Sequence, residues 1–353
     1  MAVRGLAVGG RIRETLVAGA LVPAWVAHAL LVVPFLAGLS VPLWLQYAPL
    51  AASVLVLGLP HGAVDHLAVP RVRDRPVTTR ALAGVGALYG TLGGAYLALW
   101  FLAPVPAFLL FIAITWAHWG QGDVYALLAL ADADHLRTRT QRVATAAVRG
   151  GLPMLVPLLS SPAQYRRVAR ALTGRFGVSA ADLMPLFQVE TRIALGGAFA
   201  ALTLATLGIG LARAEHGVRD AGWRIDAGET VLLWVFFLAV PPILAVGIYF
   251  CLWHSTRHIA RLVLLDPDAV VGLRGGSLGP ALRGFARDAA PLTAVSMLLL
   301  GGIYYLVPVR PANLAETVGL YLVLIAVLTL PHVVVVALMD RRQGVWNSQK
   351  NEL

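Results

Sequence analysis

Residues 314–338 read LAETVGLYLVLIAVLTLPHVVVVAL, with one carboxylate (Glu316) and one histidine (His332) among apolar residues. A helix that crosses the hydrocarbon core of a bilayer needs about 20 consecutive, mostly apolar residues. No water satisfies backbone N–H and C=O groups inside hydrocarbon, so such a run must be helical there. This stretch therefore predicts a transmembrane helix.

The rest of the chain repeats this pattern. Of 353 residues, 58% are hydrophobic and 13% charged, and the mean hydropathy is +0.75. A soluble domain carries about 25% charged residues, so a single soluble core and a disordered chain are both excluded. We predict an all-α, polytopic integral membrane helix bundle that forms one domain over residues 1–353. The other candidate spans are 15–37, 43–64, 81–103, 106–127, 143–160, 192–212, 229–252 and 290–308.

The arginines indicate how the bundle is oriented. They gather at 71–80, 137–149, 257–287 and the C-terminal pair Arg341 and Arg342, and basic loops beside apolar spans face the cytoplasm. Nine full spans would place 257–287 on the opposite side from the first two regions. We therefore favour about eight spans, with nine as the alternative, in a multi-pass protein of the cell inner membrane whose termini are both cytoplasmic.

Segment 143–160 is the one expected not to cross. It is the shortest candidate and contains Gly150, Gly151, Pro153 and Pro157, which predicts a re-entrant or broken helix. Residues 161–191 then become a cytoplasmic surface helix or loop insertion. In the third span, the spacing of Gly86, Gly90 and Gly94 predicts a flat face for close helix packing.

Charge and cysteine content exclude several functions. The net charge is +10, but the basic residues are scattered between apolar runs and form no basic groove with interleaved aromatics, so we expect no nucleic-acid binding. The single cysteine, Cys251, excludes an internal disulfide and a cysteine-based zinc site.

Six of the nine histidines fall into four polar islands within or at the ends of apolar segments. Ionisable groups at such positions are costly and are functional candidates. By contrast, His28 is expected to be a packed, hydrogen-bonded residue, and His135 and His216 to be solvated. The islands are GLPHGAVDH at 58–66, WAHWGQGD at 116–123, WHSTRH at 253–258 and LPH at 330–332.

The spacing within these islands is typical of a metal site. His254 and His258 are four residues apart, which on a helix places both imidazoles on one face. Without thiolates, several imidazoles leave copper, zinc and iron open as the metal. Asp65 and Asp123 follow His61 and His118 and are expected to accept their second ring N–H. The alternative is a helix-end salt bridge with Arg71, Arg73 or Arg257.

The four islands resemble motifs of the Brp/Blh family of integral-membrane β-carotene 15,15′-dioxygenases, over about residues 43–340. The resemblance implies oxidative cleavage of the central double bond of β-carotene, with Fe(II) and O₂, into two all-trans retinals that supply microbial rhodopsins. It implies a catalytic iron site formed by His61, His118, His254 and His258. His66 and His332 would support these ligands or line the pocket. The long segment 160–192 and the extended N-terminus depart from the small family members.

A carotenoid is wholly apolar, dissolves in the bilayer and could enter between helices. The candidate pocket residues are aromatic, although aromatics in membrane helices also serve as packing or interface belts. The alternative functions are a haem-, copper- or carotenoid-binding membrane protein without cleavage activity, a different membrane non-haem iron oxygenase, and a transporter. The pocket candidates are Trp116, Trp119, Tyr249, Phe250, Trp253, Tyr304 and Tyr305.

Overall fold

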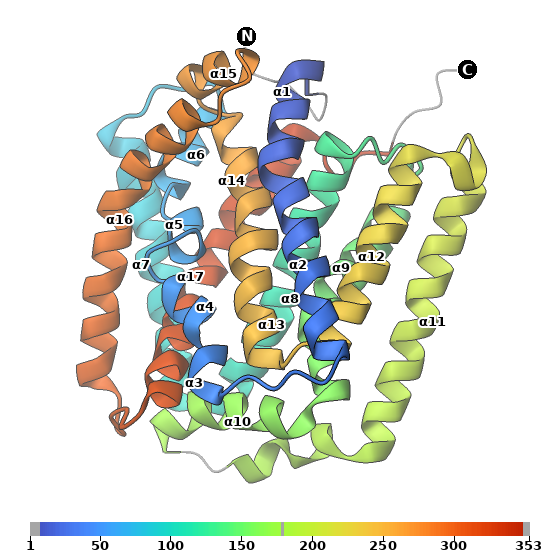
Figure 1. Cartoon of the computed structure of the whole chain (residues 1–353). Helices are drawn as coiled ribbons and strands as arrows, with labels where there is room; N and C mark the ends of the chain where they lie inside the picture. The colour runs from blue at the N-terminus through green and yellow to red at the C-terminus, as the bar shows by residue number, and fades with distance from the viewer. Residues whose placement is uncertain (1–7, 178–179, 349–353) are drawn as a thin grey trace.

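The computed structural model describes residues 8–177 and 180–348, and residues 1–7, 178–179 and 349–353 lie outside the description. The secondary structure of the described residues is entirely helical, and the long helices run roughly along one axis (Figure 1). Six of the described helices are long and apolar enough to cross a membrane. The prediction of an all-α, polytopic membrane bundle is confirmed. The six are Gly10–Leu36 (α1 Gly10–Leu16, η1 Val17–Leu21 and α2 Val22–Leu36), α7 Thr79–Leu102, α9 Arg139–Ser160, α11 Val189–Arg213, α16 Gly279–Leu306 and α17 Leu314–Gln343.

Two of these helices turn most of their apolar surface outward. Only 17% of the most apolar stretch of α11 is buried in the bundle, and only 11% of that of α16. Ile193, Leu204 and Leu298 are each at least 70% exposed. Exposed apolar area on this scale is typical of a surface that meets lipid or a partner. The centre of the bundle is formed instead by α8 (Pro104–Leu130), α17 and the helices at 242–263.

The predicted span at 43–64 is not one helix. The chain forms α3 Leu43–Gln46, α4 Ala48–Ala52 and α5 Gly58–Gly62, followed by α6 Asp65–Val72. Pro49 and Pro60 lack an N–H to donate, and Leu57 has a φ of 62°. The resulting turn needs a glycine next to it, because a Cβ on Gly58 would lie 2.4 Å from Cβ of Ser53. The break delivers His61 into the bundle interior.

The expected break at 143–160 is also wrong, because α9 is continuous from Arg139 to Ser160 and long enough to span. Thr138 and Gln141 form a capping box at its start. The two internal prolines do not interrupt it, and its glycines serve close packing on α8. A Cβ on Gly150 would lie 1.9 Å from the carbonyl oxygen of Trp116.

The predicted span at 229–252 is two antiparallel helices. Helix α12 (Ala221–Ala239) ends before the extended residues Val240 and Pro241. The chain then returns as α13 Pro242–Ile248, the π-helix η5 Tyr249–Ser255 and α14 Thr256–Val263 (Figure 1). A proline at the first helical position favours a new helix start, and Pro241–Pro242 was the sequence signal for this reversal.

This extra reversal brings the arginine-rich regions to one end of the bundle. Arg13 of α1 pairs with Asp132, which follows α8, and Arg142 donates to the carbonyl of Val345 beyond α17. Arg71 pairs with Asp288 of α16 at 2.8 Å. Helix α15 (Pro267–Arg274) and the start of α1 lie at this end as well (Figure 1). The prediction that the arginine-rich regions lie on one side of the bundle is therefore confirmed. The segment responsible is the reversal at Pro241, and not a break in 143–160.

The insertion expected at 161–191 forms a helix, but at the other end of the bundle. Helix α10 (Pro162–Thr173) lies across the end opposite α15 (Figure 1). It is followed by η2 Gly174–Phe176 and η3 Ala180–Phe187, with 178–179 outside the description. Arg175 pairs with Glu316 at 2.8 Å, at the start of α17. The segment therefore does not share an end with the arginine-rich loops. The short helix η4 (Gly217–Arg219) connects α11 to α12.

Candidate metal centre

Five imidazoles converge in the interior from four parts of the chain, with His254 and His258 on one continuous helical run. The ring of His118 lies 4.7 Å from those of His254 and His332. The ring of His61 lies 5.2 Å from those of His254 and His332 and 5.4 Å from that of His258. None of the five side chains is more than 7% exposed. We call these residues the histidine cluster; they come from α5, α8, η5, α14 and α17.

Five ring nitrogens of the histidine cluster are buried without a hydrogen-bond partner. Both nitrogens of His118 and the Nε2 atoms of His254, His258 and His332 are buried and accept or donate no hydrogen bond. One ligand atom each from His61, His118 and His332 lies within 4.8 Å of the other two, and the same holds for Asp65, His258 and His332. Buried polar atoms are normally paired, and neutral imidazole is a common metal ligand. The cluster therefore fits a metal ion with nitrogen ligands.

Two glycines lie next to rings of the histidine cluster. A Cβ on Gly62 would lie 3.5 Å from the ring of His332, and a Cβ on Gly122 would lie 3.5 Å from that of His254. The carbonyl oxygen of Gly58 contacts Nδ1 of His61, which leaves Nε2 as the nitrogen turned to the cluster. Both Cβ distances are ordinary van der Waals contacts, so Gly62 and Gly122 lie beside the rings without being required there.

A π-helical turn carries His254. The segment Tyr249–Ser255 is π-helical, and single π turns inside helices are frequent at functional sites. The rings of His254 and His258 are 6.4 Å apart and within 15° of parallel. The sequence prediction that both rings share one helix face is confirmed.

Asp65 contacts a histidine, but not the one expected. Its Oδ2 accepts a hydrogen bond from Nδ1 of His332 at 2.8 Å and one from the hydroxyl of Tyr89 at 2.6 Å. The break between α5 and α6 separates Asp65 from His61 and turns it toward α17. His332, expected in a supporting or pocket role, lies inside the cluster itself.

Asp123 and His66 lie outside the cluster. Asp123 follows His118 by five residues, which is about 140° around a helix, and it accepts hydrogen bonds from Nε1 of Trp253 at 3.1 Å. It also lies 3.6 Å from Arg257, so the salt-bridge alternative is correct for this residue. His66 contacts the carbonyl of Ala63, and burial lowers its pKa.

A cavity of about 710 Å³ borders the histidine cluster, within the range of ligand pockets in proteins. His61, His118 and His332 form part of its wall. It extends from Tyr165 of α10 at one end of the bundle to His66 of α6 toward the other. Nearly all of the remaining lining is apolar, as a hydrocarbon ligand would require.

The glycine stripe of α7 faces this cavity. Gly86, Gly90 and Gly94 line it, and a Cβ on any of them would meet no atom within 4 Å. The predicted close helix packing at these residues is therefore wrong. Their missing side chains widen the cavity.

Of the seven aromatic pocket candidates, Trp119 and Phe250 line the cavity. Trp116 packs on Phe199, and its Nε1 donates to the carbonyl of Ala147. Tyr305 is 71% exposed. The other three, Tyr249, Trp253 and Tyr304, are likewise not among the described lining residues.

Sequence reasoning missed other residues of the cavity wall. Phe108, Phe111 and Thr115 line the cavity on the same helix as His118. Their spacing of three and four residues places them on one helix face, so helical periodicity counted back from His118 would have found them. Tyr89 and Tyr165 come from helices that only the fold brings to the cavity.

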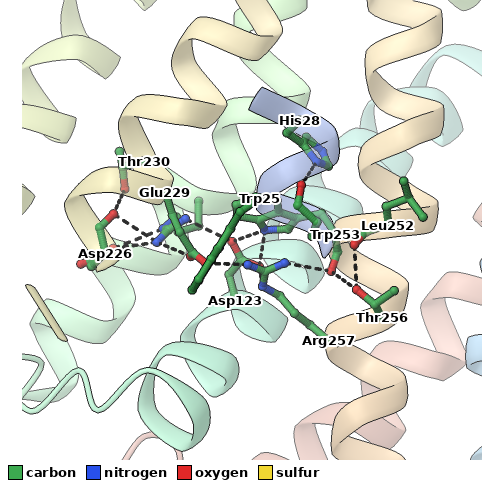
Figure 2. A network of polar contacts seen from close by, with 12 residues as sticks. Trp25, His28, Asp123, Asp226, Glu229, Thr230, Leu252, Trp253, Thr256 and Arg257 are labelled. Carbon is green, nitrogen blue, oxygen red and sulfur yellow. Dashed lines mark hydrogen bonds and ion pairs between the residues drawn. The ribbon is translucent and has the colours of Figure 1, made fainter. Parts of the chain in front are cut away.

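A second buried polar group includes Asp123, Glu229 and Arg257 (Figure 2). Arg149 pairs with Asp226 and Glu229 at 2.9 Å each, and Arg257 pairs with Glu229 at 2.6 Å. With Asp123, we call these residues the charge network. His135, expected to be solvated, is 1% exposed and contacts Asp226 at 3.1 Å. His28 is packed and bonded to the carbonyl of Ala24, as expected.

The fold and the site together define a class: polytopic helical membrane proteins with a buried multi-histidine centre that opens on an apolar cavity. Comparison with known proteins narrows this class. The chain belongs to the β-carotene 15,15′-dioxygenase family, whose model, described as "Beta-carotene 15,15'-dioxygenase", matches residues 52–340.

Curated relatives cover most of the chain. It is 52% identical to the probable β-carotene 15,15′-dioxygenase Blh of Halobacterium salinarum, over 95% of this chain and 96% of the relative. It is 32% identical to the probable β-carotene 15,15′-dioxygenase Brp of Halobacterium salinarum, over 88% of both chains. A β-carotene 15,15′-dioxygenase of an uncultured marine bacterium is 25% identical, over 82% of this chain and 92% of that one. No solved structure matches the chain.

Proposed function

We propose that this chain cleaves the central 15,15′ double bond of β-carotene with O₂ and releases two all-trans retinals. One carotene and one O₂ contain all the atoms of two retinal molecules, so the reaction breaks one C=C bond, forms two C=O bonds and needs no external reductant. The observation that carries the proposal is a cluster of imidazoles with unpartnered nitrogens that borders an apolar cavity, with His118 and His332 in the cavity wall.

We propose that His61, His118, His254 and His258 hold a ferrous ion. Imidazole nitrogens suit iron, copper and zinc, and among these the non-redox zinc ion does not fit a reaction with O₂. Bound iron would supply the activation of O₂ for the oxidative cleavage. The unpartnered nitrogens of His118, His254 and His258 support this ligand set.

The protein's own part is to position the polyene and exclude water. Trp119 lies 5.5 Å from the ring of His254, and Phe250 lies 5.5 Å from that of His61, and both line the cavity. They present flat apolar faces where the polyene would pass the histidine cluster. Because the cavity extends along the bundle, a long substrate can lie beside the cluster with its central bond nearest the imidazoles.

We also propose that the single bundle lies in the cell membrane with its arginine-rich end in the cytoplasm, and that both termini are cytoplasmic. The 161–191 insertion would then lie at the outer face. The substrate would enter from the surrounding lipid, and the retinal product would supply a microbial rhodopsin.

Expression in bacteria that accumulate β-carotene tests this function. We expect the orange colour to fade and retinal to appear by chromatography. The His254→Ala variant should leave the colour unchanged at equal protein level, whereas His216→Ala, at an exposed loop position, should behave as the wild type. Colour retained by the wild-type protein, with carotenoid co-purifying, would instead identify a binding protein without cleavage activity.

A further inference from the structure

We propose that His332 is a fifth imidazole ligand of the same metal ion, and that Asp65 and Tyr89 fix its orientation. The inference rests on the metal site of the proposed function. It goes beyond the four ligands proposed there, and it gives a role to a histidine that the sequence assigned only to a supporting or pocket position.

The first argument is the place of His332 within the cluster. Its ring lies 4.7 Å from that of His118, 5.0 Å from that of His258 and 5.2 Å from that of His61. It belongs to both groups of residues whose ligand atoms lie within 4.8 Å of one another. An ion placed among these rings would contact His332 as readily as its neighbours.

The second argument is the orientation of the ring. Nδ1 of His332 donates to the carboxylate of Asp65 at 2.8 Å, which leaves Nε2 as the acceptor nitrogen. That Nε2 is buried and has no hydrogen-bond partner. Metal-bound histidines commonly donate their other N–H to a carboxylate, which fixes the ring and raises its basicity. His332 is the member of the histidine cluster that has this arrangement among the described residues.

The third argument is the charge of Asp65. The carboxylate is 1% exposed, its Oδ1 has no hydrogen-bond partner, and among the described residues it forms no ion pair with arginine or lysine. A buried carboxylate without a cation is strongly unfavourable. A divalent ion on the far side of His332 would supply the missing positive charge. The hydroxyl of Tyr89, on α7, donates a hydrogen bond to Oδ2 of Asp65 at 2.6 Å.

A fifth imidazole changes what the site can hold. If the ion takes six ligands, four imidazoles would leave two positions for other molecules and five would leave one. A single free position would leave room for one small molecule such as O₂. The polyene would then be held by the cavity wall without bonding to the metal.

The experiment measures metal binding in purified, detergent-solubilised protein. Iron affinity is obtained by competition with a chelator, and the number of imidazole ligands by X-ray absorption. We expect His332→Ala to lower iron affinity by at least about 100-fold and to remove one imidazole from the spectrum. Asp65→Asn keeps the shape but not the charge, and should lower affinity by about 10-fold, within the range for partners of metal-bound histidines. Tyr89→Phe should have a smaller effect in the same direction.

Tyr321→Phe is the matched control. It removes a buried hydroxyl from the same helix as His332, where it contacts Ser53 rather than Asp65, and iron binding should be unchanged. If His332→Ala does not fold, His332→Gln and Asp65→Asn decide the question, because both preserve size.

Unchanged iron affinity and an unchanged imidazole number in the His332 variants would overturn the inference, even if retinal production fell. Failure of the proposed function looks different: the wild-type protein would bind no iron or would leave β-carotene intact. A wild type that binds iron and cleaves β-carotene, beside variants with identical iron spectra, would refute the fifth ligand alone.

Discussion

The histidine cluster and the charge network are both buried in the same bundle, yet they leave their polar atoms in opposite states. In the charge network, Arg149 and Arg257 pair with carboxylates at 2.6–2.9 Å. In the histidine cluster, His118 has no hydrogen-bond partner at either nitrogen. The carboxylates of the first region are paired with arginines inside the protein, although Nη1 of Arg149 has no hydrogen-bond partner, whereas five ring nitrogens of the second region have none.

The two regions are joined along one helix. Arg257 of the charge network precedes His258 of the histidine cluster, and its guanidinium lies 3.8 Å from the ring of Trp253. Trp253 in turn donates to Asp123 (Figure 2). The network therefore holds the helical segment that carries His254 and His258. Two buried polar groups can therefore be distinguished by whether their partners lie within the protein. The group with unpartnered atoms is the candidate site.

The largest expected effect comes from removing the unpartnered imidazole at the centre of the cluster. His118→Leu should reduce retinal formation below detection, because loss of a ligand exceeds the roughly 10–100-fold loss typical of removing a ligand's partner. The metal-free protein should nevertheless become more stable, by about 1–3 kcal/mol, since an unsatisfied buried polar group is replaced by an apolar one. Product chromatography and thermal unfolding after chelation measure the two effects. A metal-free His118→Leu protein less stable than the metal-free wild type would show that His118 is not an unsatisfied buried group.

Arg149→Met should instead lower the stability of the fold. It leaves Asp226 and Glu229 as buried charges without this partner, at a cost of about 3–5 kcal/mol, and we expect little folded protein. The yield of monodisperse protein and its unfolding temperature provide the measurement. Arg137→Met is the matched control, because the exposed pair of Arg137 with Glu215 is worth about 0–1 kcal/mol. Wild-type stability in Arg149→Met would show that the network is not structural.

A smaller change tests the connection between the two regions. Trp253→Phe removes the hydrogen bond to Asp123 but keeps an aromatic ring under Arg257. Hydrogen bonds to charged groups are worth about 1.5–3 kcal/mol, so the unfolding temperature should fall while iron remains bound. Trp116→Phe, which loses a bond to a neutral carbonyl, should lose only about 1 kcal/mol. Equal losses in the two variants would argue against a special role for Asp123.

The smallest expected effect concerns the cavity. Gly90→Phe places a ring in the cavity where a Cβ meets no atom within 4 Å, and should lower kcat/KM for β-carotene by about 10-fold with iron binding intact. Gly84→Phe makes the same substitution on the same helix at an exposed position outside the cavity lining. If both variants cleave β-carotene equally well, the substrate does not pass this part of the cavity.

The sequence also predicted part of the site. His61, His118, His254 and His258 could be predicted as a group because histidines are rare in membrane-embedded segments and are therefore informative. The structure brings their rings together. The partners were predicted less well. Asp65 was assigned to His61 and Asp123 to His118, whereas Asp65 contacts His332 and Asp123 joins the charge network. The hydrogen-bond partner of such a side chain depends on its direction after a helix breaks, and this direction cannot be inferred from composition.

The amino-acid sequence by itself determined that this is a helical membrane protein and which histidines are set apart from its apolar background. Both follow from local composition, because lipid leaves the backbone no alternative to a helix. Only the tertiary structure decided that 43–64 is broken, that the chain reverses at Pro241, and that His332 lies among the other rings. These features depend on packing between different segments of the chain. The contact of Gly58 with Ser53 and the hydrogen bond of His332 to Asp65 select one arrangement among several that the local sequence allows.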